Sequence, residues 1–226
     1  MKKTIITIAA IATLAIPAIS GAAPAKPGPY ASAFLGATMA QDADVNTDVF
    51  ASPPAFRDRV EFDPGINIGG TGGYDFGYLR VEGELSYKHS EMKAITDRDT
   101  GARYRSVDGD LGVFAFMANS FFDLHNDTPI TPYFGGGIGV ATLYMGETTG
   151  VDNSGIRQTL YLKDNDSVFA YQLGAGVDIA INRKISLDLG YRYFGTSRAT
   201  FDKDWAQSTD LKYESHNMAV GVRFKF

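Results

Sequence analysis

The stretch that decides the fold stands at the end of the chain: Met218-Ala-Val220-Gly-Val222-Arg-Phe224-Lys-Phe226. Large apolar residues alternate in it with small or charged ones, and a period of two places them on one face of a β-strand. In a soluble sandwich this face would meet a core, and such a strand would rarely end the chain with an aromatic residue. The alternation therefore predicts a strand whose apolar face meets lipid.

The other end of the chain has the pattern of a secretory signal peptide. Met1-Lys2-Lys3 precede an apolar run over residues 5–19, and small residues follow at 20–23. The run is too short to cross a bilayer comfortably as a retained anchor. We expect residues 1–22 to be the signal peptide, residues 23–29 a short periplasmic tether, and residues 30–226 the folded domain.

Composition excludes several classes of protein. The net charge is −5 and the basic residues are scattered, which disfavours nucleic-acid binding. The chain has no cysteine, so it has no disulfide framework, thiol nucleophile or thiolate metal site. The glycine runs at 69–73 and 135–139 lack the Lys-Ser/Thr of a phosphate loop, and 164–166 lacks the glycine and the distal Glu of a calcium loop. We expect no cofactor and no metal.

Segments of alternating apolar and polar residues fill the rest of the chain, and none approaches the ~20 apolar residues of a membrane-spanning helix. A membrane protein made from this sequence must then be a closed barrel, because lipid cannot satisfy an open sheet edge. The segment 106–122 leaves its facing open, because Phe114 and Phe116 oppose an apolar set at 111–117. The expected strands are 30–39, 60–74, 78–88, 106–122, 132–144, 168–181, 185–194 and the C-terminal stretch.

The connections between these strands are alternately long and short. Long extracellular loops and short periplasmic turns are typical of a transmembrane barrel, and an even strand number places both termini in the periplasm. The predicted fold class is all-β, an eight-stranded antiparallel up-and-down transmembrane β-barrel, with ten strands as the alternative. Four long connections are expected at 41–59, 89–105, 145–167 and 195–212. Interfacial aromatic girdles are expected from Tyr30, Tyr74, Tyr87, Tyr144, Tyr193 and Tyr213.

Three stretches carry a resemblance to a known family: residues 60–65 (VEFDPG), 80–87 (RVEGELSY), and 169–178 (FAYQLGAGVD) followed by 187–194 (LDLGYRYF). They resemble the eight-stranded outer-membrane barrels, which include OmpA-like transmembrane domains and Opa-type surface antigens. The resemblance implies membrane integrity, adhesion, antigenicity or minor pore behaviour, according to the member. Nothing follows Phe226, so we expect no peptidoglycan-binding domain. The terminal alternation resembles the family's C-terminal assembly signal, here Met218, Val220, Val222, Phe224 and Phe226.

Charged residues on the polar faces of the strands would point into a narrow lumen. Buried charges must be paired, so the sequence predicts a salt-bridged plug, with a gated ion path as the alternative. We expect Arg192 and Arg223 each to find a carboxylate among Glu82, Glu84 and Asp188. The predicted lumen network consists of Arg80, Glu82, Glu84, Lys88, Asp110, Asp178, Asp188, Arg192 and Arg223.

The three histidines give little support to an enzyme. His89-Ser90 and Ser215-His216 are adjacent pairs whose side chains alternate faces in a strand, and His125 lies in an expected periplasmic turn. The function expected is a structural, adhesive or antigenic surface protein in a Gram-negative outer membrane, with a small porin second and a lipid-modifying enzyme last. Expected partners are outer-membrane lipid and lipopolysaccharide, the barrel-assembly machinery and periplasmic chaperones, and an extracellular receptor of the long loops.

Overall fold

The computed structural model describes residues 27–49, 56–126, 128–204 and 207–226. The expected signal peptide and residues 23–26 of the expected tether lie outside this part of the chain. Within it, no helix is long and apolar enough to cross a bilayer. The first strand begins at Gly28, so the last two residues assigned to the tether belong to the sheet.

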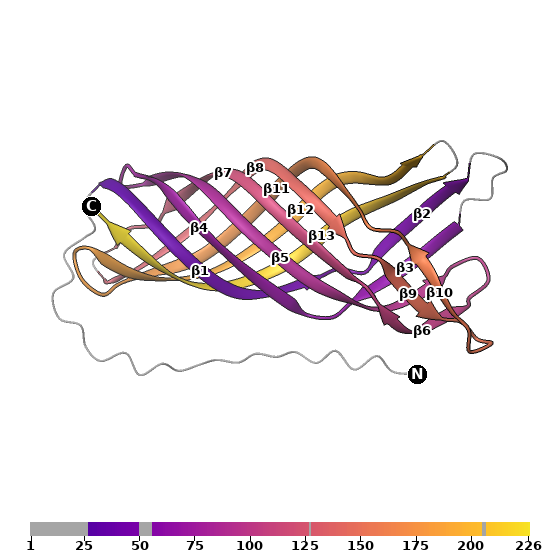
Figure 1. Cartoon of the computed structure of the whole chain (residues 1–226). Helices are drawn as coiled ribbons and strands as arrows, with labels where there is room; N and C mark the ends of the chain where they lie inside the picture. The colour runs from indigo at the N-terminus through magenta and orange to yellow at the C-terminus, as the bar shows by residue number, and fades with distance from the viewer. Residues whose placement is uncertain (1–26, 50–55, 127, 205–206) are drawn as a thin grey trace.

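Eight long strands form a closed ring. Each pairs antiparallel with the next one in the ring, and the last pairs with the first, so every strand has two partners. The predicted eight-stranded up-and-down barrel is confirmed (Figure 1). In ring order the strands are β1 (Gly28–Ala40), β4 (Gly65–Asp75), β5 (Leu79–Asp97), β7 (Asp110–Asp123), β8 (Ile130–Met145), β11 (Asp164–Ala180), β12 (Ile185–Asp204) and β13 (Gln207–Lys225).

The ring closes between the first strand and the last. β1 and β13 stay in register from Tyr30↔Lys225 to Ala40↔Ser215 without a bulge. At the periplasmic end, the backbone N–H of Phe226 donates to the carbonyl oxygen of Pro29 at 3.1 Å. The ladder therefore continues to the final residue, and the membrane portion has no free edge.

Five short strands lie beyond the barrel, at the end opposite the C-terminus (Figure 1). These strands consist mostly of residues expected in loops, and that expectation was wrong; residues 60–62 and 106–108 belong to expected strands. Together with the outer ends of β5, β12 and β13 they form a sheet in the order β12-β13-β2-β3-β5-β6-β9-β10, which we call the outer sheet. The five strands are β2 (Ala43–Val49), β3 (Phe56–Phe62), β6 (Arg103–Asp108), β9 (Thr148–Val151) and β10 (Arg157–Tyr161).

Two expected strands are interrupted where they leave the membrane. The segment 60–74 breaks at Asp63-Pro64, because proline has no N–H to give to a ladder. The segment 106–122 breaks at Gly109, whose carbonyl oxygen accepts from the N–H of Met92 at 2.9 Å. Each break separates a membrane strand from an outer strand; both pair with β5, but their second neighbours differ.

The side chains alternate between lipid and lumen along every membrane strand. Leu35, Ile138 and Leu173 are each at least 60% exposed on the outer wall, where lipid covers them. Phe114 and Phe116 also point outward, which settles the facing of β7. Two residues expected in the aromatic girdles, Tyr30 and Tyr213, are instead buried inside the barrel. Tyr74, Tyr87 and Tyr144 are exposed, as a girdle requires.

Candidate functional site

The inward face of β5 begins a layer of polar side chains in the periplasmic half of the lumen. Arg80, Glu82, Glu84, Ser86 and Lys88 occupy every second position, and each is almost completely buried. The interior of an eight-stranded barrel is only wide enough for side chains, so these charges need partners from the facing strands. We call these five residues and their hydrogen-bond partners the polar layer.

Arg192, on β12, lies at the centre of the polar layer. Its guanidinium donates to Glu84 and, at 3.4 Å, to Oε1 of Glu82. The rings of Phe34 and Phe121 lie 5.5 and 5.4 Å from its Cζ atom. The expected carboxylate partners of Arg192 included both glutamates, and the structure pairs it with both.

Arg223, on β13, forms a second centre nearer the periplasm. It donates to Asp178 and, at 2.8 Å, to Oδ2 of Asp188. Its Cζ atom lies 5.0 Å from the ring centre of Tyr30, and the hydroxyl of Tyr30 donates to Oε2 of Glu82 at 2.5 Å. Tyr30 therefore joins the two arginine centres into one network.

Two amides that the sequence analysis did not single out complete the shell of Glu84. Asn119 and Gln172 each donate to Oε2 of Glu84 at 2.9 Å, and Gln172 also donates to Oδ1 of Asn119 at 2.7 Å. A carboxylate offers about four lone-pair sites, more than one arginine fills. Inward polar positions on β7 and β11 were the available signal for these residues.

Two further ion pairs, also missed from sequence, close the periplasmic mouth. Nε of Arg80 lies 2.9 Å from Oδ2 of Asp123, and Nζ of Lys225 lies 2.7 Å from Oδ2 of Asp75. Both aspartates are the last residues of their strands, where the sequence placed turns. The two aspartates lie next to their cations only because the closed ring of strands brings these residues together.

Asp110 does not belong to the polar layer, so this part of the predicted network was wrong. Its side chain is 49% exposed, and its Oδ2 atom lies 3.7 Å from Nδ1 of His89 at the outer rim of the barrel. The prediction assumed a continuous strand from 106 onward. The membrane strand actually begins at Asp110, so the residue lies where the barrel wall meets the outer sheet.

Lys88 marks the upper boundary of the polar layer. Its ammonium group donates to Oγ of Ser86 at 3.1 Å and lies 4.1 Å from the ring centre of Phe194. Within the part of the chain that the structure describes, Lys88 forms no ion pair. Its charge is stabilised by a hydroxyl and a ring face where the lining changes from polar to apolar.

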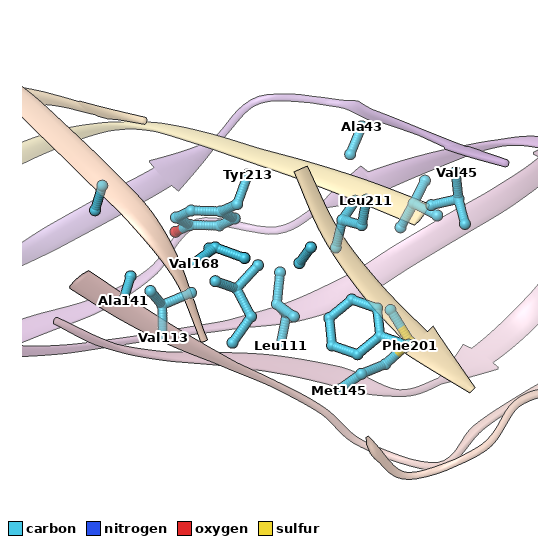
Figure 2. Close-up of a cluster of buried hydrophobic side chains, with 14 of the residues drawn as sticks. Ala43, Val45, Leu111, Val113, Ala141, Met145, Val168, Phe201, Leu211 and Tyr213 are labelled. Carbon is cyan, nitrogen blue, oxygen red and sulfur yellow. The ribbon is translucent and has the colours of Figure 1, made fainter. Parts of the chain in front are cut away.

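Apolar side chains fill the outer half of the lumen and continue into the outer sheet (Figure 2). The predicted salt-bridged plug therefore occupies only the periplasmic half of the interior. β7 shows the change most clearly, because Leu111, Val113, Ala115 and Met117 point inward and are at most 1% exposed. We call this cluster the apolar layer; its other large members include Val45, Ile95, Leu143, Met145, Phe194, Phe201, Leu211 and Tyr213.

A small cavity lies inside the polar layer beside Arg192 and Arg223. Its volume is about 20 Å³, which is room for one or two water molecules. Tyr133 lies along the inner wall across β11 and donates to Oδ1 of Asp188 on β12 at 2.9 Å. Its hydroxyl lies so close to Gly176 and Gly190 that a Cβ atom there would come within 2.5 and 2.8 Å. These glycines make room for the tyrosine.

The outward face of the outer sheet carries ion pairs that join residues of its strands and of the connections between them. Each pair joins side chains that water reaches, so the contribution of each to stability is small, below about 1 kcal/mol. Their arrangement fixes a pattern of alternating charge on the surface. The pairs are Arg59–Asp42, Arg98–Asp44, Arg57–Asp99, Arg103–Glu61 and Lys93–Asp63.

A partly buried hydrogen bond ties β10, the last of the outer strands, to β3. The hydroxyl of Tyr161 on β10 donates to Oδ2 of Asp58 on β3 at 2.7 Å. Burial raises the pKa of the Asp58 carboxyl above its usual value, although the bond from Tyr161 opposes that effect. Burial and the nearby carboxylate also raise the pKa of the Tyr161 hydroxyl. The outer sheet is therefore curled around its own small core.

Two of the three histidines lie on the opposite face of their strands from the adjacent serine. His89 and His216 point outward, whereas the adjacent Ser90 and Ser215 are buried on the inner face. His216 is held at both ring nitrogens, by Tyr191 at 2.6 Å and Gln41 at 3.1 Å. In the described residues, no group of three or more His, Asp or Glu side chains is placed to hold a metal ion.

A closed ring of eight strands, with an apolar outer wall and a filled interior, defines an integral outer-membrane β-barrel. Comparison with known proteins agrees. Residues 6–226 match the family described as outer membrane protein beta-barrel domain, and the chain belongs to that family. The protein is thus an integral component of the outer membrane of a Gram-negative bacterium, in contact with its lipid.

Individual relatives cover nearly the whole chain. The outer membrane protein PagN of Salmonella typhimurium is 26% identical over 92% of this chain and 93% of its own. A candidate adhesin of Rickettsia bellii is 23% identical over 99% of both chains. The crystal structure of the outer membrane protein OprG from Pseudomonas aeruginosa has the same fold, with a TM-score of 0.62 at 12% identity, covering 91% of this chain and 99% of that one.

Removing Arg192 should destabilise the barrel strongly. Arg192→Met leaves Glu82 and Glu84 buried without their cation, which typically costs about 3–5 kcal/mol. Urea unfolding in lipid vesicles, followed by the gel mobility of unboiled samples, would measure the loss. Adding Glu82→Gln and Glu84→Gln should restore most of the stability, whereas Arg59→Gln, which breaks an exposed pair, should change it by less than about 1 kcal/mol. Equal effects of Arg192→Met and Arg59→Gln would contradict the assignment.

Proposed function

We propose that this protein is a non-enzymatic adhesin of the bacterial surface, in which a sealed barrel acts as the anchor for the outer sheet. The observation that carries the proposal is the outer sheet itself. Where the structure describes the long connections, they consist largely of paired strands that present ordered charged side chains outside the membrane. A preorganised surface loses little conformational entropy when it binds.

The contact surface we propose is the outward face of β2, β3, β5 and β6. Arg57 and Asp99 are 61% and 42% exposed although they are ion-paired, so a partner can reach both. Ordered charges of both signs give specificity to an interface more than raw affinity. The resemblance to a candidate adhesin over the full chain length supports this role, and a surface-exposed sheet is also a natural antigen.

A porin is the weaker alternative because the lumen is blocked twice. The polar layer fills the periplasmic half with paired charges, and the members of the apolar layer above it carry no charge, while the nearby hydroxyls of Tyr213 and Thr38 bond to each other. A rearrangement of the charged network alone would not open a continuous path. A lipid-modifying enzyme is also weaker, since the outward histidines have serines only on the opposite face of their strands.

Refolded protein in planar bilayers should give no steady conductance, because both layers block the lumen. Replacing Arg192 and Glu84 by alanine should still give none, since the apolar layer remains. Adding Met145→Ala and Phe201→Ala should produce openings, because both blocks are then weakened. Steady, ohmic conductance of the unmodified protein would reject the sealed anchor and favour the porin.

Bacteria that display the protein should attach to cultured animal cells, and attachment should depend on the outer sheet. Arg57→Asp with Asp99→Arg keeps the ion pair but exchanges its charges, and we expect it to reduce attachment several-fold while surface display is unchanged. Asn126→Ser, at the periplasmic end, is the matched control and should have no effect. Attachment no greater than that of cells without the protein would refute adhesion.

We also propose that β13 acts as the assembly signal before it pairs with β1. The alternating residues from Met218 to Phe226 point outward, and Phe226 is 82% exposed, so they are available to the barrel-assembly machinery and to chaperones until lipid covers them.

Deleting Phe226 should reduce insertion into the outer membrane much more than it reduces export. The amount of heat-modifiable protein in the outer-membrane fraction, compared with the total in the periplasm and membranes, would measure this. Phe76→Ala, which removes another exposed aromatic side chain at the periplasmic end, should leave insertion intact. Normal insertion of the deletion variant would exclude the signal role.

A further inference from the structure

Aromatic and polar side chains gather on the lipid-facing wall near the outer ends of β11, β12 and β13. The ring centres of Tyr193 and His216 lie 5.5 Å apart, and those of Tyr171 and Tyr193 lie 6.4 Å apart. Tyr191 also stacks on His216, with their ring centres 6.0 Å apart. We call Tyr171, Tyr191, Tyr193, Glu214 and His216 the wall cluster.

The wall cluster depends on a glycine. Tyr171, Gly195 and Glu214 lie directly opposite one another on three neighbouring strands. A Cβ atom at Gly195 would lie 2.6 Å from the Tyr171 ring, so only glycine lets the ring lie across β12. The Tyr171 hydroxyl thereby reaches β13 and donates to Oε1 of Glu214 at 3.4 Å. The Tyr171 ring fits on the outer wall because Gly195 has no side chain.

Two cations stand directly beside this cluster. Nζ of Lys212 lies 2.7 Å from Oε1 of Glu214, and Arg198 is the residue directly opposite Lys212 on β12. Like charges at directly opposite positions destabilise a sheet. Among the described residues, Arg198 has no ion-pair partner, and Asp210 lies further out along β13. An anion bound between Arg198 and Lys212 would relieve their repulsion.

An apolar groove runs along the wall from the same tyrosine. It is an open groove of about 630 Å³, and its lining includes Tyr171, Ile138 and Leu173. Ile138 and Leu173 are 61% and 64% exposed, and the small residues Ala118 and Gly136 line the groove with them. Because Tyr171 belongs both to the groove and to the wall cluster, the two form one continuous surface.

We propose that this surface binds one molecule of a phosphorylated glycolipid of the outer leaflet. An acyl chain lies in the groove between Ile138 and Leu173. The sugar lies against the rings of Tyr193 and His216, with its hydroxyls within reach of Glu214, and a phosphate lies between Arg198 and Lys212.

Each part of the surface matches one part of the proposed ligand. A groove in the hydrocarbon zone accepts an acyl chain, aromatic rings with an apolar face and a polar edge suit the membrane interface, and guanidinium and ammonium groups bind phosphate. Basic residues next to membrane-embedded walls are a known basis for headgroup recognition. A phospholipid would satisfy the groove and the cations but would leave the wall cluster without a sugar.

The test is native mass spectrometry of the detergent-solubilised barrel titrated with diphosphoryl lipid A. Arg198→Gln with Lys212→Gln should weaken binding about tenfold, because two charge-assisted hydrogen bonds to phosphate are lost. Ile138→Ala with Leu173→Ala should weaken it by a similar factor through loss of the groove walls. The matched controls are Arg157→Gln, an exposed arginine of the outer sheet, and Leu85→Ala, a lipid-facing residue outside the groove; both should bind like the unmodified protein.

Three further ligands distinguish the sources of the anion. Dephosphorylated lipid A should bind the unmodified protein weakly. Its affinity should match that of diphosphoryl lipid A for the Arg198→Gln, Lys212→Gln variant. Phosphatidylglycerol should bind at least tenfold more weakly than diphosphoryl lipid A, and inorganic phosphate should not displace it. Equal binding of phosphatidylglycerol, displacement by phosphate, or unchanged binding by both double variants would each overturn the proposal, whatever the outcome of the adhesion and conductance experiments.

Discussion

The requirement that every backbone N–H and C=O in lipid has a partner governs the rest of this structure. Hydrocarbon offers no substitute for a missing hydrogen bond, so a sheet in the membrane must close. Pairing of β1 with β13 over eleven registered residue pairs meets this requirement and closes eight strands around a lumen too narrow for a water-filled channel. The outer sheet is free of the constraint, because water satisfies its edges. It opens accordingly, with β10 pairing only with β9 among the described strands.

The filled lumen follows from the small diameter of the ring, but its division into two layers does not. Charges in the periplasmic half are joined by Arg192 and Arg223 into one network, whereas Leu111 to Met117 and their neighbours form an ordinary apolar core in the outer half. The apolar layer continues into the outer sheet and supports it from below. The barrel is therefore both a membrane anchor and the lower part of the core on which the exposed surface rests.

The sequence analysis located the eight membrane strands because lipid on one side enforces a strict period of two. The prediction failed outside the membrane, where lipid no longer imposes this period. Outer strands such as β2 are short and exposed to water on one face, so their polar residues were taken for loops; of β3 and β6, only the ends nearest the barrel, at 60–62 and 106–108, were placed in strands. Asp110 was placed in the lumen for the same reason, because an uninterrupted strand was assumed through Gly109. Tyr30 and Tyr213 were assigned to the girdles by residue type, although their positions face the lumen.

By itself, the sequence determined the class of fold, the number of membrane strands and the need to pair Arg192 and Arg223, since these follow from alternation and from the cost of burying charge. Only the tertiary structure decided which strands face one another across the lumen. That decision brought Asn119 and Gln172 to Glu84, stacked an apolar layer on a polar one, and laid Tyr171 over Gly195 beside Lys212. The physical reason is that alternation fixes which side of a strand a residue occupies, whereas contacts across a closed ring depend on shear and register, which no local pattern encodes.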